Sequence, residues 1–129
     1  MSDVLQETFT VNIRDKNYVF RIPSIRFDIE VGYESRRIRQ DADPLGRGDL
    51  NNIDAATIQF ALYCAIIKLY LVSADVQWIY SAGPDGKPVI DPLKFPRNKN
   101  TTVYLIGEAF IKEYERFRDD GDTTESTST

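Results

Sequence analysis

The sequence predicts an α+β fold that is mainly helical, with a small N-terminal β-hairpin followed by about three helices around a central apolar helix. Residues 8–13 alternate between apolar and polar side chains at the period of a strand, and residues 18–22 are expected to return as a second strand. Residues 55–72 form a helix-length run that is apolar on nearly every side. With 129 residues the chain is long enough for one self-sufficient core, so we expect a single globular domain over residues 1–118.

Two short strands and a polar connection predict the opening hairpin. Apolar and polar residues alternate from Thr8 to Ile13, and residues 14–17 (Arg-Asp-Lys-Asn) have the length of a hairpin loop. We expect Asn17 to adopt the left-handed conformation there, because asparagine tolerates it. Residues 18–22 return as the second strand, and Pro23 ends it because proline has no amide donor.

The first helix is expected to run from an N-cap at Ser24 to about Gln40. Gly32 weakens a helix by about 1 kcal/mol relative to alanine, so we expect it to permit close packing or to mark a bend. The expected buried stripe consists of Ile25, Ile29, Gly32 and Tyr33. The expected outer face consists of Arg26, Glu30, Glu34 and Arg37.

The central helix follows a loop over residues 41–52, with Asn52 or Asp54 as its expected N-cap. A helix that is apolar all round is buried centrally, spans a membrane, or keeps one face for a partner. A membrane span needs about 20 apolar residues, and Lys68 near the middle costs on the order of 3 kcal/mol on insertion. We therefore expect a soluble domain that does not enter a membrane. One apolar face consists of Ile58, Leu62, Ala65, Leu69 and Val72, and the other of Phe60, Tyr63, Ile67 and Leu71.

A proline-rich segment separates the central helix from the last one. Residues 76–80 are expected to form a short strand, with Val89 and Ile90 pairing back across a turn at residues 84–87. Three prolines limit regular structure, so residues 82–99 are expected to be a structured loop with at most a short hairpin. Its neighbouring aromatic residues fit either of two roles, anchors for a partner or a plug at the end of the helical core. They are Trp78, Tyr80 and Phe95.

The last helix is expected to begin with a cap at Thr101 or Thr102. Its apolar residues recur at helical spacing and form one stripe, which we expect to dock on the central helix. These residues are Val103, Ile106, Phe110, Tyr114 and Phe117. Residues 119–129 contain no apolar side chain, which predicts a disordered acidic tail rich in serine and threonine.

Charge and residue inventory argue against several classes of function. Four of the 20 acidic residues follow residue 118, so residues 1–118 hold 16 acidic and 16 basic residues and are neutral. Non-specific nucleic-acid binding needs a cationic surface, so we expect none. The chain has no histidine and one cysteine, which removes the commonest general base and thiolate zinc sites. We expect Cys64 to be a core residue.

The remaining candidate for a metal site is the aspartate-rich loop before the central helix. Its acidic residues lack the spacing of a calcium-binding loop and are expected to be solvated turn residues. They are Asp41, Asp43, Asp49 and Asp54. We therefore expect no catalytic residue, no cofactor site and no metal site, and a protein that is not an enzyme.

Four segments follow one another in a characteristic layout. They are the hairpin TFTVNIRDKNYVFRIP, the segment SIRFDIEVGYESRRIR, the apolar helix AATIQFALYCAIIKLYLV, and an amphipathic helix before an acidic tail. Over residues 8–118 this layout resembles the tail assembly chaperones of long-tailed bacteriophages, most characteristically in the strand–proline–helix passage at residues 18–30.

The resemblance implies a mainly helical protein of the host cytoplasm that binds and solubilises the tape measure protein, a long and largely helical polypeptide. It also implies recruitment of the major tail tube protein, and it is compatible with a homo-oligomer and with a longer form made by frameshifting. The main alternative is a structural virion component, such as a tail completion or head–tail connector subunit. A further alternative is a regulator that binds a host protein through the acidic tail.

We expect the central and last helices to frame an apolar groove for this partner, because an amphipathic helix binds in such a groove. The residues expected to line it are Leu62, Ile66, Tyr70, Phe110 and Tyr114. The alternative is that these five residues are ordinary core residues.

Overall fold

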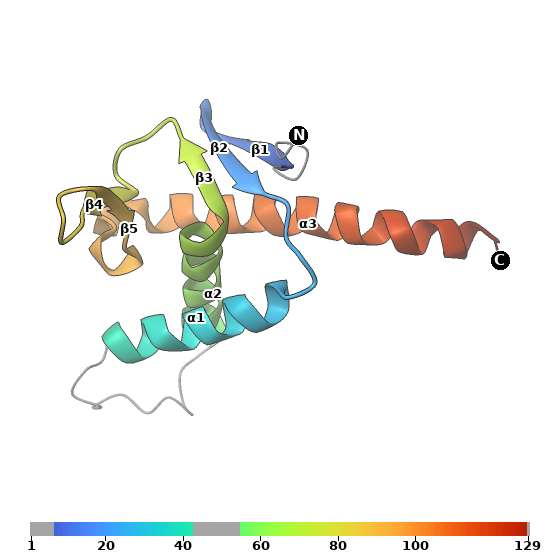
Figure 1. The fold of residues 1–129 in the computed structure, drawn as a ribbon, viewed down its shortest axis with the longest axis horizontal. Coiled ribbons are helices and arrows are strands. Elements are labelled where there is room, and N and C mark those ends of the chain that lie inside the picture. Colours follow the sequence, from blue (N-terminus) through green and yellow to red (C-terminus); the bar gives the residue numbers. More distant parts are fainter. Residues whose placement is uncertain (1–6, 43–54, 129) are drawn as a thin grey trace.

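The computed structural model describes the backbone of residues 7–42 and 55–128, and the side chains of residues 7–41 and 57–116. These residues form a small α+β fold with three α-helices and small antiparallel sheets, as the sequence predicts. The helices are α1 (Phe27–Ala42), α2 (Ala55–Tyr70) and α3 (Asn100–Ser128). The strands are β1 (Thr8–Ile13), β2 (Lys16–Arg21), β3 (Leu71–Ala74), β4 (Tyr80–Ala82) and β5 (Pro88–Ile90). In Figure 1, α2 stands between α1 and α3, and the β1–β3 sheet lies at the C-terminal end of α2.

The predicted hairpin is confirmed, but its turn is tighter than expected. β1 and β2 pair antiparallel in a register that sets Phe9 opposite Phe20. Arg14 and Asp15 carry the turn, with φ angles of 54° and 69°. Two successive positive φ angles are the pattern of a two-residue hairpin turn, whose twist matches that of the strands. Asn17, expected in the left-handed conformation, instead lies within β2.

The central helix ends two residues earlier than predicted, because the chain continues into a third strand. α2 stops at Tyr70, and β3 pairs antiparallel with β2, which becomes the central strand of the sheet. Arg21 of β2 donates a hydrogen bond to the carbonyl of Leu69 in the last turn of α2. A helix leaves its last carbonyls without backbone partners, so this contact supports the end of the helix at the sheet edge.

The first helix turns a different face to the core than predicted. α1 begins at Phe27, and its buried residues are Phe27, Val31, Glu34 and Ser35. The residues expected to be buried, Ile25, Ile29 and Tyr33, are exposed, and Gly32 is exposed with them. The physical reason is an ion pair: Lys68 Nζ, in the last turn of α2, lies 2.7 Å from Glu34 Oε2, so the buried carboxylate is neutralised.

The segment between β3 and α3 is ordered around one short hairpin. β4 and β5 pair antiparallel, so the predicted return of Val89 and Ile90 is confirmed. Of the expected strand over residues 76–80, Tyr80 alone belongs to β4. Two 3₁₀ turns, Pro92–Lys94 and Arg97–Lys99, lead into α3. Trp78, Tyr80 and Phe95 pack against the core, with Trp78 and Phe95 edge to face at 5.2 Å, as expected for a plug.

The last helix begins at Asn100 and does not stop at the expected boundary at residue 118. Val103, Ile106 and Phe110 are buried, which confirms the predicted stripe where side chains are described. The helix continues to Ser128 through the segment expected to be a disordered tail, and Figure 1 shows this part extending beyond the rest of the fold. Adding residues to an existing helix is much easier than nucleating one, and no proline interrupts the segment.

Candidate functional site

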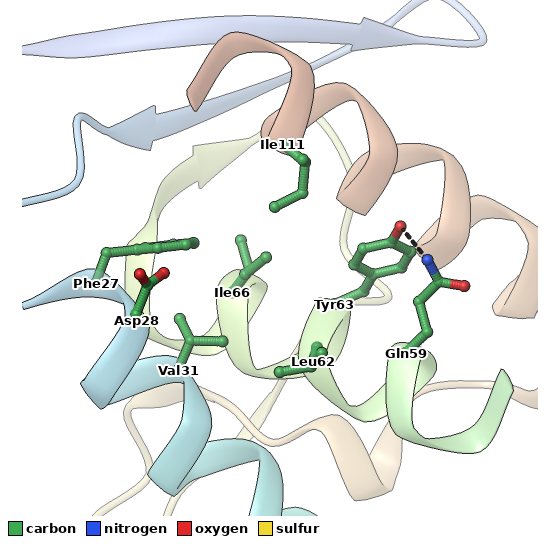
Figure 2. A pocket seen from close by; sticks show the side chains of 8 residues that line it. All are labelled: Phe27, Asp28, Val31, Gln59, Leu62, Tyr63, Ile66 and Ile111. Atoms are coloured by element: carbon green, nitrogen blue, oxygen red, sulfur yellow. Dashed lines mark hydrogen bonds between the residues drawn. The ribbon is translucent and has the colours of Figure 1, made fainter. Parts of the chain in front are cut away.

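An open apolar groove lies where the three helices meet. It has a volume of about 320 Å³, and Figure 2 shows its side chains converging from the three helices. Phe27, Asp28 and Val31 come from α1, Gln59, Leu62, Tyr63 and Ile66 from α2, and Ile111 from α3. We call this the three-helix groove.

The polar groups of the three-helix groove offer little to a small polar ligand. The Gln59 side chain donates a hydrogen bond of 2.9 Å to the Tyr63 hydroxyl, which Figure 2 draws as a dashed line. The Asp28 side chain comes from the exposed first turn of α1. Small-molecule sites combine an apolar lining with several convergent polar groups. With one amide already engaged and one exposed carboxylate, the groove is suited to apolar side chains.

Close packing of α2 on α3 shapes one end of the three-helix groove. A Cβ placed on Gly107 of α3 would lie 2.1 Å from Cγ of Tyr63. The Tyr63 ring therefore lies directly on the backbone of α3, and Gly107 makes the close approach possible. Tyr104 meets the same ring edge to face at 5.7 Å. These contacts fix the orientation of an aromatic side chain that lines the groove.

The structure separates the five residues that the sequence selected for partner binding. Leu62, which is half-buried, lines the three-helix groove, as does Ile66, which is 1% exposed and also belongs to the core. Phe110 is fully buried and Tyr70 is 4% exposed, so both belong to the core. Tyr114 is half-buried and packs on Phe27, with the ring centroids 4.4 Å apart.

Tyr70 is held by a polar network that explains its position in the core. Its hydroxyl donates a hydrogen bond of 2.7 Å to Glu30 Oε1 of α1, and the Arg21 guanidinium lies 5.1 Å from the ring centroid. Burial and the neighbouring Glu30 carboxylate raise the pKa of the Tyr70 phenol. Tyr70 thus ties α2 to α1 and to β2, and it does not present its hydroxyl to a partner.

Six of the eight residues that line the three-helix groove were not selected from the sequence, among them the apolar Phe27, Val31 and Ile111. Phe27 and Val31 were missed because the opposite face of α1 was expected to be buried. A spacing signal for the true inner face does exist, since Phe27, Val31 and Ile38 recur at intervals of four and seven residues. The acidic side chain of Glu34 interrupts that stripe and made the other face look more apolar.

Comparison of the chain with protein families, curated proteins and solved structures found no match. Among residues 7–42 and 55–128, none of the helices combines the length and the hydropathy of a membrane span. The same residues contain no cluster of three or more potential metal ligands, and the loop that holds Asp43, Asp49 and Asp54 lies outside them, as do the expected caps Asn52 and Asp54.

The single thiol is positioned as a core group. Cys64 lies on α2 and is 1% exposed, as the sequence predicts. Burial raises the pKa of its thiol to about 12. A nucleophilic cysteine needs the opposite shift, because the thiolate is the reactive form.

The raised thiol pKa predicts a loss of stability at alkaline pH. In the unfolded chain Cys64 ionises near its ordinary pKa of 9.0, whereas in the folded protein it stays neutral up to about pH 12. The unfolded state therefore releases a proton first, and the free energy of unfolding falls by about 1.4 kcal/mol per pH unit across this window. We expect urea denaturation at pH 8 to 11 to give a steeper decline for the wild-type protein than for Cys64→Ala. Equal slopes would contradict the assignment.

Proposed function

We propose that this protein binds an apolar helical segment of another protein in the three-helix groove, and that it acts as a phage tail assembly chaperone for the tape measure protein. In this role it holds the long helical partner in soluble form in the host cytoplasm and helps recruit major tail tube subunits. The observation that carries the binding part of the proposal is the open apolar groove of about 320 Å³ between α1, α2 and α3. The identity of the partner rests on the sequence resemblance.

The physical chemistry of the three-helix groove supports a helix as its occupant. Leu62 of α2 and Ile111 of α3 are half-buried and present apolar surface to the groove, and Phe27 of α1, which is 4% exposed, completes its lining. This surface suits the ridge of side chains that an amphipathic helix offers at intervals of three and four residues. Burying apolar surface yields about 25 cal/mol per Å². A few hundred Å² thus gives several kcal/mol before the cost of association, which suits reversible holding by many copies along one long polypeptide.

The test is co-expression with the tape measure protein of the same genome, followed by pull-down and sedimentation. We expect a soluble complex with several copies per partner, and insoluble partner when this protein is absent. Leu62→Glu places a carboxylate in the groove and is expected to reduce complex formation at least tenfold. Leu93→Glu is the matched control, because Leu93 is 48% exposed and lies outside the groove.

Failure of the partner to bind would contradict the chaperone function, and equal binding by both leucine variants would contradict its placement in the groove. Tyr70→Asp is a poor probe of this surface, since the carboxylate would be buried beside Glu30 and would disturb the fold. A structural virion component would instead be found by mass spectrometry in purified particles. That result would replace the chaperone with a tail completion or connector subunit.

A further inference from the structure

Acidic side chains border the three-helix groove on its α1 side and on its α3 side. Asp28 lines the groove from the first turn of α1, and Figure 2 shows its carboxylate beside the Phe27 ring. On α3, Glu108 lies three residues before Ile111 and Glu115 lies four residues after it, and residues at these spacings are neighbours on the surface of a helix. All three acidic side chains are exposed. We call Asp28, Glu108 and Glu115 the acidic rim.

The charge of Glu108 acts on a side chain that lines the groove. Tyr63 is 6% exposed and lies beside Gln59, whose amide donates a hydrogen bond to the Tyr63 hydroxyl. Burial and, after it, the negative charge of Glu108 raise the pKa of the Tyr63 phenol. The field of Glu108 therefore reaches the end of the groove that Tyr63 and Gln59 form, and it favours a positive charge placed there.

The acidic rim has no cation of its own. None of its three carboxylates forms an ion pair within residues 7–41 and 57–116. The first turn of a helix favours a negative charge, which accounts for an acidic residue at position 28 but does not supply it with an ionic partner. A concave surface edged by charge of one sign attracts a partner of the opposite sign.

The basic residues of α2 and α3 do not neutralise the groove. Residues 57–67, which include the α2 lining, contain no charged side chain. Lys68 Nζ is paired with Glu34 at 2.7 Å, and the Arg116 guanidinium lies 3.0 Å from Glu113 Oε1. Lys112 directly follows Ile111, which sets it about 100° further round α3.

The basic residues of α1 are also placed away from Asp28. Arg26 precedes Asp28 by two residues, and its carbonyl accepts a helical hydrogen bond from the amide of Glu30. Two residues of an α-helix span about 200°, so Arg26 lies nearly opposite Asp28 around the axis. The other arginines begin about 12 Å further along the helix axis. They are Arg36, Arg37 and Arg39.

We propose that the three-helix groove selects a cationic amphipathic helix, which carries lysine or arginine on both sides of its apolar ridge. The inference rests on the proposed function, because it assigns the chemistry of the helix that the groove holds. The apolar ridge contacts Leu62 and Ile111. A cation on one side of the ridge meets Asp28 of α1, and a cation on the other side meets the α3 part of the acidic rim. Charges at the edge of an interface mainly set specificity and association rate, so a helix with acidic flanks is rejected.

Fluorescence anisotropy of two labelled synthetic peptides, titrated with the full chain, tests this proposal. Both peptides have about 18 residues, enough to form a helix, and leucine at intervals of three and four residues. One peptide carries lysine beside the leucine ridge and the other carries glutamate at the same positions. We expect the lysine peptide to bind at least tenfold more tightly at low salt. This preference should largely disappear in about 1 M salt, where the Debye length is about 3 Å.

Variants locate the preference, because the whole chain has a net charge of −4 and attracts cations weakly from any side. The double variant Asp28→Asn, Glu108→Gln removes two rim charges at nearly constant side-chain size, and we expect it to reduce the preference for the lysine peptide at least fivefold. The matched control is Asp15→Asn, Asp85→Asn. It removes two exposed carboxylates outside the groove lining and should leave the preference unchanged. Asparagine tolerates the positive φ of 69° at position 15. Circular dichroism establishes that each variant is folded.

The proposal is overturned if the two peptides bind equally, if neither binds, or if the control variant reduces the preference as much as the rim variant does. These outcomes are separate from the co-expression test. A tape measure protein that stays soluble with this chain while the peptides bind equally would retain the proposed function and reject the charge selection. Selective binding of the lysine peptide without a tape measure complex would retain the charge selection and reject the chaperone function.

Discussion

Replacing Phe110 with alanine is expected to lower the free energy of unfolding by about 3–5 kcal/mol, the range for removing a buried aromatic ring. Phe110 is fully buried at the centre of a cluster of rings. Its ring centroid lies 5.0 Å from that of Phe20, 5.4 Å from Phe9, 5.6 Å from Phe27 and 6.1 Å from Tyr70. Those neighbours belong to β2, β1, α1 and α2, so one side chain of α3 connects five elements of the fold.

Urea denaturation of a short variant series measures this effect. Phe110→Leu keeps most of the buried volume and is expected to cost clearly less than Phe110→Ala, because the residual cavity is smaller. Phe95→Ala removes a half-buried ring that packs edge to face on Trp78, outside the ring cluster around Phe110, and a smaller loss is expected. If Phe110→Ala were no more destabilising than Phe95→Ala, Phe110 would not be the organising residue of the core.

The fold class was predictable because the spacing of apolar residues along the chain indicates which segments are helices or strands that bury one face. The alternation over Thr8–Ile13 and the stripe that includes Val103, Ile106 and Phe110 depend on local spacing, and the structure confirms both. The end of α2 was not predictable in the same way. Leu71 and Val72 continue the helical pattern, but β2 offers them unpaired backbone groups, and strand pairing is a tertiary contact that spacing does not encode.

The inner face of α1 was predicted wrongly because Glu34 and Lys68, which form an ion pair in the structure, appear in the sequence as two unrelated charges. Glu34 made the true inner face look polar, and Lys68 looked like the polar edge of an otherwise apolar helix. The structure joins them at 2.7 Å across the α1–α2 interface. A carboxylate and an ammonium group that neutralise each other can be buried at a much lower cost than either alone. The sequence shows each charge separately, and only the packing of the helices shows the pair.

The α2 side of the three-helix groove was partly predictable from the sequence, whereas the contribution of the other helices depends on tertiary packing. Leu62 and Ile66 were selected because α2 has more apolar surface than one contact can bury, and both line the groove. Tyr70 and Phe110 lie on similar stripes but in the core. Periodicity identifies which faces of a helix are apolar. The position of a groove depends on where the neighbouring helices diverge and leave such a face uncovered, and this is a property of tertiary packing.

Replacing Gly107 with alanine is the second substitution with a large expected effect, and we expect it to lower the free energy of unfolding by about 2 kcal/mol. The added Cβ would lie 2.1 Å from Cγ and 2.3 Å from Cδ1 of the Tyr63 ring. These atoms lie at the ring's attachment to its stem, so rotation of the ring does not relieve the overlap and α2 and α3 must separate. Overpacking typically costs about 1–3 kcal/mol, and a contact as short as 2.1 Å belongs at the upper end of that range. The cost therefore outweighs the gain of about 1 kcal/mol in helix propensity.

Gly32→Ala is the matched control for Gly107→Ala. Both glycines lie inside helices, but a Cβ at position 32 meets no atom within 4 Å. We therefore expect Gly32→Ala, measured in dilute solution, to stabilise the protein by about 0.5–1 kcal/mol. The same substitution thus has opposite signs at two positions because one glycine serves packing within the protein and the other does not.

A double-mutant cycle with Tyr63→Ala isolates the cause of the Gly107 effect. Without the ring there is no overlap, so Gly107→Ala in the Tyr63→Ala background is expected to be neutral or stabilising, because helix propensity alone remains. The sign of the Gly107 effect should therefore reverse between the two backgrounds. A loss of equal size in both would show that the backbone of α3, and not its contact with Tyr63, requires glycine. Since Tyr63 also lines the three-helix groove, reversal would establish that the helix crossing and the groove depend on one contact.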